Sequence, residues 1–381
     1  MGRKNALYLC LAVTALVTLG LVMLTSTSVW DDEVDGYSLV KKQALFITLG
    51  IFGALVVSHM DYRKFRALWI PALVTSSLLL ILCYVPGVGQ SIKGETRWIK
   101  VPGLPQFQPS ELAKIFVIMA LAAWYTHFQT EGRKLIKGFV LPSILLVIPV
   151  GLIFFEKDMG TAMALGAAGG MVMYVAGARF VYLATAGISA LGGMALVVWK
   201  NPERRGRVMA LFDLEGDEYR LGDGYQQLHG LYAFANGGVK GTGLGNGVEK
   251  HGYLPEAHTD FIFPAIGEEL GLWFTLGSVF CFVVIMIYGI AIAMHANDIF
   301  GRLFAVGLTC IIVVPAMMNI GVCTAVLPNT GLPLPFISYG GTNMMFTLLA
   351  VGMLISIHRQ TCFDKRAELP VINQKKQCLR I

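Results

Sequence analysis

Ten long runs of apolar residues, separated by polar segments, dominate the chain. Each run is close to the ~17–25 residues that an α-helix needs to cross a bilayer. The runs lie at about 6–24, 43–59, 67–86, 111–127, 139–155, 160–177, 180–198, 266–294, 300–322 and 342–358. The pattern predicts an all-α, polytopic integral membrane protein with about ten transmembrane helices, which form a single domain over residues 1–381.

The first run follows two basic residues, Arg3 and Lys4, as the core of a secretory signal does. It is longer than the ~7–15 residues of such a core, and no small-x-small cleavage pattern follows it. We therefore expect a retained first helix.

Basic and acidic residues alternate between the segments that connect the runs. The basic groups are Arg3 and Lys4; Arg63, Lys64 and Arg66; Arg133, Lys134 and Lys137; Arg179; Arg302; and the tail at 359–381. They fall on the opposite side from Asp31, Asp32, Glu33 and Asp35. By the positive-inside rule both termini, including the basic tail, are cytoplasmic, which requires an even number of helices. Residues 199–265, between the seventh and eighth helices, then form a large extracytoplasmic loop, whose charged part at 201–220 is a candidate amphipathic segment on lipid headgroups.

The composition agrees with a membrane protein and excludes other classes. Only 14% of residues are charged, against about 25% in soluble domains. The net charge of +6 does not indicate nucleic-acid binding, because the basic residues lie between apolar runs rather than on one stripe. The seven cysteines show no metal-binding spacing and are assigned to packing. The glycine-rich segment at 241–247 lacks the GxGxxG spacing and a preceding strand, so it is not a nucleotide site.

Three extracytoplasmic connections are longer than turns and are where we expect function: 86–110, 199–265 and 323–341. A charge at membrane depth costs roughly 2.5–3.5 kcal/mol, so each ionisable residue near a span is a functional candidate.

The first connection leads into a helix start with a proline at 109. Lys114 lies one turn inside the span, on the same face as Glu111. Two readings are open. The pair is only a structural salt bridge, or Lys114 and Arg97 present positive charge to a diphosphate, with Trp98 beside them at headgroup depth.

A tight turn at 156–161 joins two spans. Asp158 and Thr161 in this turn are explained by capping of the next helix.

Acidic residues gather where the long loop enters the eighth span: Glu256, Asp260, Glu268 and Glu269, with His258 among them. A carboxylate entering hydrocarbon has a raised proton affinity and can act as a general base. Capping by Asp260 alone is the alternative, but a cap does not require two more acids within three turns. A metal site at Glu256, His258 and Asp260 is also open, although the spacing fits no standard site.

The third connection is rich in proline and glycine. Its prolines at 328, 333 and 335 forbid a regular helix, whereas Ser338, Gly340 and Gly341 let a ligand approach the backbone closely. Non-helical backbone at membrane depth is tolerated where it lines a cavity.

Taken together, these segments resemble the shape, elongation, division and sporulation family of bacteria, which includes FtsW, RodA and SpoVE. The resemblance covers nearly the whole chain. Its signatures are the RW segment at 97–98 with QPSELAK at 108–114, EKDMGT at 156–161, GYLPEAHTDFIF at 252–263 with GEELG at 267–271, and PLPFISYGG at 333–341. Lys157 departs from the family pattern, in which proline is usual at this place.

The resemblance implies an enzyme of the bacterial cytoplasmic membrane that polymerises lipid II into β-1,4 glycan strands, with inversion at C1. Asp260 matches the family's essential aspartate and would take the proton of the acceptor hydroxyl. Arg97 and Lys114, or a divalent cation such as Mg²⁺ or Mn²⁺, would offset charge on the diphosphate. Further candidates for contact with lipid II are Trp98, Glu111, His258, Glu268, Glu269 and Ser338.

The resemblance also implies partners: a class B penicillin-binding protein and other divisome proteins. The motifs are closer to the division and sporulation members than to the elongation branch, which remains an alternative. A transporter that flips lipid II is a second alternative, because broken loops and intramembrane charges suit it. Against it, the acids cluster at one face rather than forming a relay. A non-catalytic scaffold would not need Asp260 beside Glu268 and Glu269.

Overall fold

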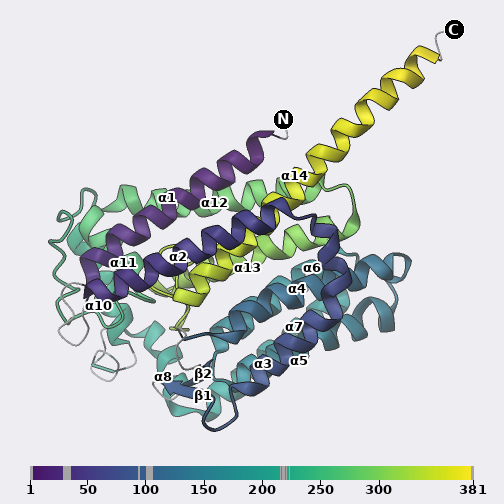
Figure 1. Cartoon of the computed structure of the whole chain (residues 1–381). Helices are drawn as coiled ribbons and strands as arrows, with labels where there is room; N and C mark the ends of the chain where they lie inside the picture. Colours follow the sequence, from purple (N-terminus) through teal and green to yellow (C-terminus); the bar gives the residue numbers. More distant parts are fainter. Residues whose placement is uncertain are drawn as a thin grey trace.

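The computed structural model describes residues 3–28, 36–92, 95–99, 106–214, 216, 219, 221–222 and 224–378. Ten long helices in this part correspond to the ten predicted runs (Figure 1). They are α1 (Arg3–Ser28), α2 (Gly36–His59), α3 (Trp69–Leu82), α4 (Pro109–His127), α5 (Leu141–Phe155), α6 (Met159–Val175), α7 (Phe180–Lys200), α12 (Leu272–His295), α13 (Ile299–Cys323) and α14 (Gly341–Cys378). A 3₁₀ helix, Tyr62–Leu68, precedes α3, and a π-helical turn, Ile136–Val140, precedes α5.

Eight helices in the described part are long and apolar enough to cross a membrane. The two remaining ones, α4 and α6, are buried along most of their length, and α6 has only 17 residues. The prediction of a polytopic, helical membrane protein is confirmed.

Three details differ from the sequence-based expectation. The chain is not purely α, because β1 (Gly89–Ile92) and β2 (Glu95–Ile99) form an antiparallel hairpin within the first long connection. The run at 266–294 is not one helix, because α11 (Ile262–Leu270) ends at Gly271 before α12 begins. Gly271 has φ +78°, and a side chain there would collide with the backbone of Val239 and Gly241. Finally, α14 continues beyond the predicted span to Cys378.

The β-hairpin and three short α-helices gather at one end of the bundle, which we call the loop end. Figure 1 shows the hairpin, α8 (Pro202–Met209), α10 (Tyr225–Gly237) and α11 at this end. The start of α1 and the end of α14 lie at the opposite end. Both terminal helices therefore leave the bundle on the same side, as an even helix count requires. The acidic residues predicted for the opposite side, Asp31 to Asp35, lie outside the described residues.

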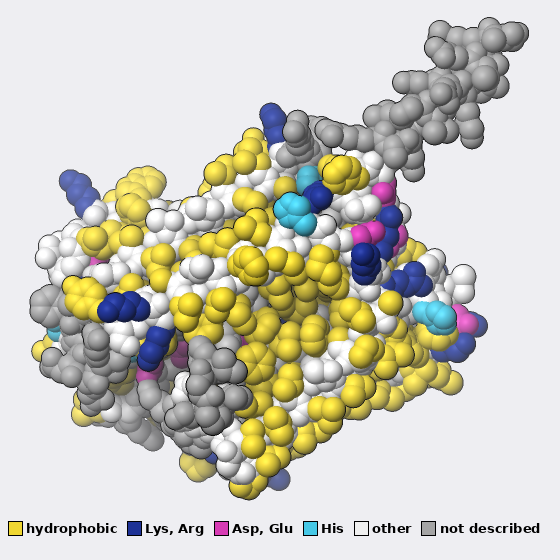
Figure 2. All heavy atoms as spheres, viewed as in Figure 1, with side chains coloured by type: hydrophobic (Ala, Val, Ile, Leu, Met, Phe, Trp, Pro, Cys, Tyr) yellow, Lys and Arg dark blue, Asp and Glu magenta, His cyan; other side chains and the backbone are white. Residues whose placement is uncertain are grey.

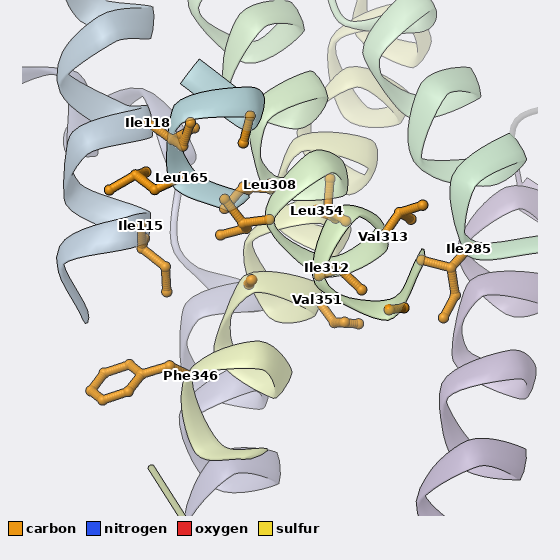
Figure 3. Packing of buried hydrophobic residues seen from close by; sticks show 14 of the residues in the cluster. Ile115, Ile118, Leu165, Ile285, Leu308, Ile312, Val313, Phe346, Val351 and Leu354 are labelled. Carbon is orange, nitrogen blue, oxygen red and sulfur yellow. The ribbon is translucent and has the colours of Figure 1, made fainter. Parts of the chain in front are cut away.

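The core of the bundle is built around α13 and α14, whose side chains are mostly buried inside the protein. Figure 3 shows apolar side chains of α4, α6 and α12 directed towards these two helices. Small residues allow close helix packing, as at Gly352 of α14, whose Cα faces the backbone of Ala54 in α2. By contrast, α7 has no buried residue.

The surface has the pattern of a multi-pass membrane protein. In Figure 2 apolar side chains cover the middle of the visible face, and charged side chains gather towards its two ends. A band of this kind matches the hydrocarbon layer of a bilayer.

Candidate active site

The turn before α11 positions Asp260 at the loop end. Glu256 starts this turn with φ +59°, its carbonyl accepts hydrogen bonds from the amides of Thr259 and Phe261, and its carboxylate accepts one from the Thr259 hydroxyl at 2.7 Å. From α13, the Asn319 side-chain amide donates to the Asp260 carbonyl at 2.7 Å. The backbone of Asp260 is thus fixed, while its side chain stays partly exposed.

The proline-rich segment at 327–340 packs against this turn. Asn319 also donates to the Leu332 carbonyl at 2.7 Å, so one side chain joins the Asp260 turn to the segment. The amide of Tyr339 donates to the His258 carbonyl at 2.9 Å. Gly331 has φ +65°, and a side chain there would begin 3.5 Å from Oδ2 of Asp260. Non-helical backbone therefore faces the aspartate at Gly331, whereas Gly341, at which the sequence predicted a close approach to a ligand, packs against Phe46.

The same segment contacts the start of α6. The Cα of Gly160 faces the Thr330 carbonyl and the Leu332 side chain so closely that no side chain would fit there. Two residues earlier, Asp158 caps α6 by accepting from the Thr161 amide at 3.0 Å, as the sequence predicted. The Asp158 carboxylate also lies 3.4 Å from Nη1 of Arg97 in β2. The segment thus contacts both Asp260, through Gly331, and the start of α6, where Asp158 pairs with Arg97.

A second acid, Glu156, lies in the turn before α6. Its side chain is fully buried, and among the described residues only the Cys83 thiol, a weak donor, lies beside the carboxylate. Burial, and the nearby Asp158 charge, raise the pKa of Glu156 from its ordinary 4.5 to about 8. Lys157 follows with φ +67°, a conformation that a proline at this place could not adopt.

Lys114 and Glu111 form the predicted pair, with Nζ and Oε2 2.9 Å apart and both side chains buried. The Asn343 side-chain amide of α14 donates to the same Glu111 oxygen at 3.1 Å. Trp98 pairs with Gln90 across the hairpin and is half-buried. The cation at Lys114 is therefore held by α4 and α14 rather than by a flexible loop.

Glu268 and Glu269 point into the protein. Glu269 accepts from the Ser26 hydroxyl of α1 at 2.7 Å, from Lys250 Nζ at 2.7 Å and from the Gly245 amide at 2.8 Å. Glu268 accepts from the amide of Val248 at 2.9 Å and from that of Glu249. Both carboxylates are buried and bound to these internal partners, so neither is open to a ligand next to Asp260. They fasten residues 242–250 to α11.

Ser338 also has internal partners. Its hydroxyl accepts from the Leu334 amide at 2.8 Å, and its carbonyl accepts from the Gln43 side chain of α2 at 3.2 Å. Sequence reasoning missed Gln43, Asn319 and Asn343. Each is an amide side chain inside an apolar run. A polar group without a partner is costly there, so its presence alone could have indicated a specific hydrogen-bonding role.

No three histidine, cysteine, aspartate or glutamate side chains within the described ranges come close enough together to hold a metal ion. The geometry of the described residues therefore does not support a metal site at Glu256, His258 and Asp260.

Comparison with known proteins identifies the family of the chain. The profile of the FtsW, RodA and SpoVE family, described as cell cycle proteins, matches residues 6–362. A probable peptidoglycan glycosyltransferase FtsW from Trichlorobacter lovleyi is 38% identical over 354 residues, which cover 92% of each chain. The stage V sporulation protein E of Bacillus subtilis is 36% identical over 93% of this chain and 96% of its own length.

Solved structures show the same fold. One chain, from work on "structural coordination of polymerization and crosslinking by a peptidoglycan synthase complex", superimposes with a TM-score of 0.76 at 29% identity, covering 93% of this chain and 97% of its own. The rod shape determining protein RodA of Thermus thermophilus gives a TM-score of 0.69 at 27% identity, over 93% and 96%. With the family profile matching nearly the whole chain, the protein belongs to the FtsW, RodA and SpoVE family of cell cycle proteins.

Proposed function

We propose that this protein is a peptidoglycan glycosyltransferase that polymerises lipid II into β-1,4 glycan strands at the outer face of the bacterial cytoplasmic membrane. The observation that carries the proposal is the segment at 327–340, which faces Asp260 through Gly331. Through Thr330 and Leu332 the same segment packs on Gly160, two residues after the Asp158 that pairs with Arg97. A glycosyl transfer from lipid II needs a base for the acceptor hydroxyl and a positive charge near the leaving diphosphate. A carboxylate and a cation near the same loop can meet these two needs. The names of the FtsW relatives support the same activity.

In the proposed reaction Asp260 is the general base. It accepts the proton of the 4-hydroxyl on the acceptor's N-acetylglucosamine as that oxygen attacks C1 of the donor's N-acetylmuramic acid. The bond from C1 to the undecaprenyl diphosphate breaks, and the diphosphate leaves with the electron pair. One displacement inverts C1 and gives the β-1,4 linkage.

Arg97 and Lys114 stabilise the charge that develops on the diphosphate. Asp158 orients Arg97 through its 3.4 Å contact, and Glu111 with Asn343 holds Lys114 in α4. Trp98 and His258 are neighbouring groups that contact the headgroup of lipid II. We assign Glu268, Glu269 and Ser338 to positioning, because the hydrogen bonds described above hold all three side chains inside the protein.

The proposed setting is cell division. Both termini are cytoplasmic, the loop end faces outwards, and a class B penicillin-binding protein with other divisome proteins is the partner. The similarity to FtsW and to the sporulation protein supports the division branch. Depletion in the native host separates the branches, since loss of a division enzyme gives filaments and loss of an elongation enzyme gives rounded cells.

The decisive test is polymer formation from purified lipid II by the protein with its cognate transpeptidase, comparing wild type with Asp260→Ala. We expect glycan chains from the wild type and a loss of at least about a hundredfold in the variant, because general-base catalysis contributes 10²–10⁴-fold. Equal polymer from both proteins would end the assignment of Asp260. If neither makes polymer while lipid II still crosses liposome membranes, the protein is a transporter.

A further inference from the structure

A cluster of aromatic rings at the loop end takes no part in the proposed transfer step. The His229 ring lies at its centre, with centroids 4.2 Å from Tyr225, 5.6 Å from Tyr232 and 6.1 Å from Tyr253. The His229 and Tyr253 planes are within 14° of parallel. Tyr232 and Tyr253 remain 38% and 53% exposed. We call these four residues the ring cluster.

The ring cluster also contains a carboxylate–imidazole pair. Nδ1 of His229 lies 2.6 Å from Oε2 of Glu249. The Glu249 amide in turn donates to the buried Glu268 carboxylate. The aromatic belt of a membrane protein consists of rings that face the lipid interface. Here the tyrosine rings instead surround the His229–Glu249 pair, which the Glu268 carboxylate holds from inside the protein. Such a surface can bind a ligand that has both flat apolar faces and hydroxyl groups.

The ring cluster is fixed relative to Asp260. The Gln226 side chain of α10 accepts from the Asn329 side chain at 2.6 Å, and Gln227 donates to the carbonyls of Val322 and Leu327. Asn329 belongs to the segment that carries Gly331 against Asp260. Tyr253 lies seven positions before Asp260, just ahead of the turn that Glu256 starts. The ring cluster is therefore joined to the Asp260 region both along the chain and through the segment at 327–340.

We propose that the ring cluster binds the β-1,4-linked glycan strand between successive additions. This inference rests on the proposed function and deepens it. Pyranose rings offer flat C–H faces that pack on aromatic side chains, and their hydroxyls bond to tyrosine, histidine and carboxylate groups. Holding the strand next to the reacting centre keeps its end available for the next addition.

The test measures binding without turnover. The full-length protein in detergent is titrated with a β-1,4-linked N-acetylglucosamine tetramer, and affinities are compared by microscale thermophoresis. Tyr232→Ala and Tyr253→Ala should each weaken binding by about threefold to tenfold, the worth of one stacked ring. Tyr253→Phe keeps the ring and should retain most of the affinity. Phe212→Ala, a loop-end residue that is 83% exposed outside the ring cluster, is the matched control and should bind normally.

The outcomes separate the two proposals. Asp260→Ala should bind the tetramer as the wild type does, whether or not the protein proves to be a polymerase. In the polymerisation assay the two tyrosine variants should make shorter glycan chains than Phe212→Ala. No binding by the wild type, or equal binding by Tyr253→Ala and Phe212→Ala, would overturn the proposal.

Discussion

Gly331 shows how the backbone of one residue shapes the candidate site. It has φ +65°, and its Cα faces the Asp260 carboxylate. We predict that Gly331→Ala lowers polymerisation at least about tenfold. The new methyl group would lie in contact with the base, 3.5 Å from Oδ2, and would crowd the space through which the acceptor hydroxyl reaches it. The measurement is chain formation from lipid II.

The backbone strain in this variant has its own control. Alanine in a left-handed conformation costs roughly 1–2 kcal/mol wherever it occurs. Gly87 has φ +87° and open space around it, so Gly87→Ala carries the same strain without the crowding. If the two variants lose activity equally, crowding at Asp260 is not the cause.

Because of the buried Glu156 carboxyl, we predict that the free energy of unfolding depends on pH. Its pKa is raised to about 8 in the folded protein, against the ordinary 4.5 for an unfolded chain. Between pH 4.5 and about pH 8 the folded protein holds a proton on Glu156 that the unfolded chain has lost. The contribution of this group to the free energy of unfolding is therefore full below pH 4.5. It falls by at most roughly 1.4 kcal/mol per pH unit as the pH rises to about 8. Glu156→Gln removes this loss. Its melting temperature minus that of the wild type should therefore grow from about pH 5 to about pH 8 and then level off.

The control for this prediction is a carboxylate at a more solvent-exposed site. Glu131, which pairs with Lys137 at a more exposed site, provides one. Glu131→Gln is measured over the same range. A melting-temperature difference for Glu156→Gln that changes with pH no more than that of Glu131→Gln would show that the Glu156 carboxyl is not protonated in the folded protein.

At the scale of elements, the Lys250–Glu269 pair fastens the glycine-rich part of the long loop to α11 and α1. Both side chains are almost fully buried. Lys250→Met leaves a buried carboxylate without its countercharge, which typically costs 3–5 kcal/mol. We therefore predict a clear fall in the melting temperature, partly restored by the double variant Lys250→Met with Glu269→Gln.

Lys137→Met breaks a more exposed pair and should change stability by less than about 1 kcal/mol. Equal falls for the two lysine variants would show that the loop is not held by the buried pair.

Helices were predictable from the sequence because hydrophobic runs of bilayer length have few alternatives. The hairpin at 89–99 and the break at Gly271 were not. Short strands leave no long periodic pattern, and glycine is common inside transmembrane helices, so it does not by itself indicate a break.

The candidate site was predictable in its residue types but only partly in its geometry. The Glu111–Lys114 pair and the Asp158 cap follow from local spacing along one helix. The partners of Glu269 do not, because Ser26 lies 243 positions away in the chain. The acids at 268–269 therefore looked like part of a reactive cluster, whereas long-range contacts show them fastening a loop.

At the scale of the molecule, the functional groups occupy one end of the bundle and the terminal helices leave at the other (Figure 1). This placement of the functional groups at one end supports an enzyme rather than a transporter. A transporter needs a ligand site near the membrane midplane that opens to both sides. The Asp260 turn, the segment at 327–340 and the Asp158–Arg97 pair instead form one layer at the loop end.

That layer must face outwards if the protein builds cell wall, and this can be tested in intact cells. The basic residues at 133, 134 and 137 lie in the connection before α5, which the positive-inside rule places in the cytoplasm. In a variant with the seven native cysteines replaced, Leu244→Cys in the long loop should react with a membrane-impermeant thiol reagent, since Leu244 is exposed. Lys134→Cys should react only after the membrane is permeabilised. The reverse pattern would place the Asp260 layer in the cytoplasm and exclude glycan synthesis outside it.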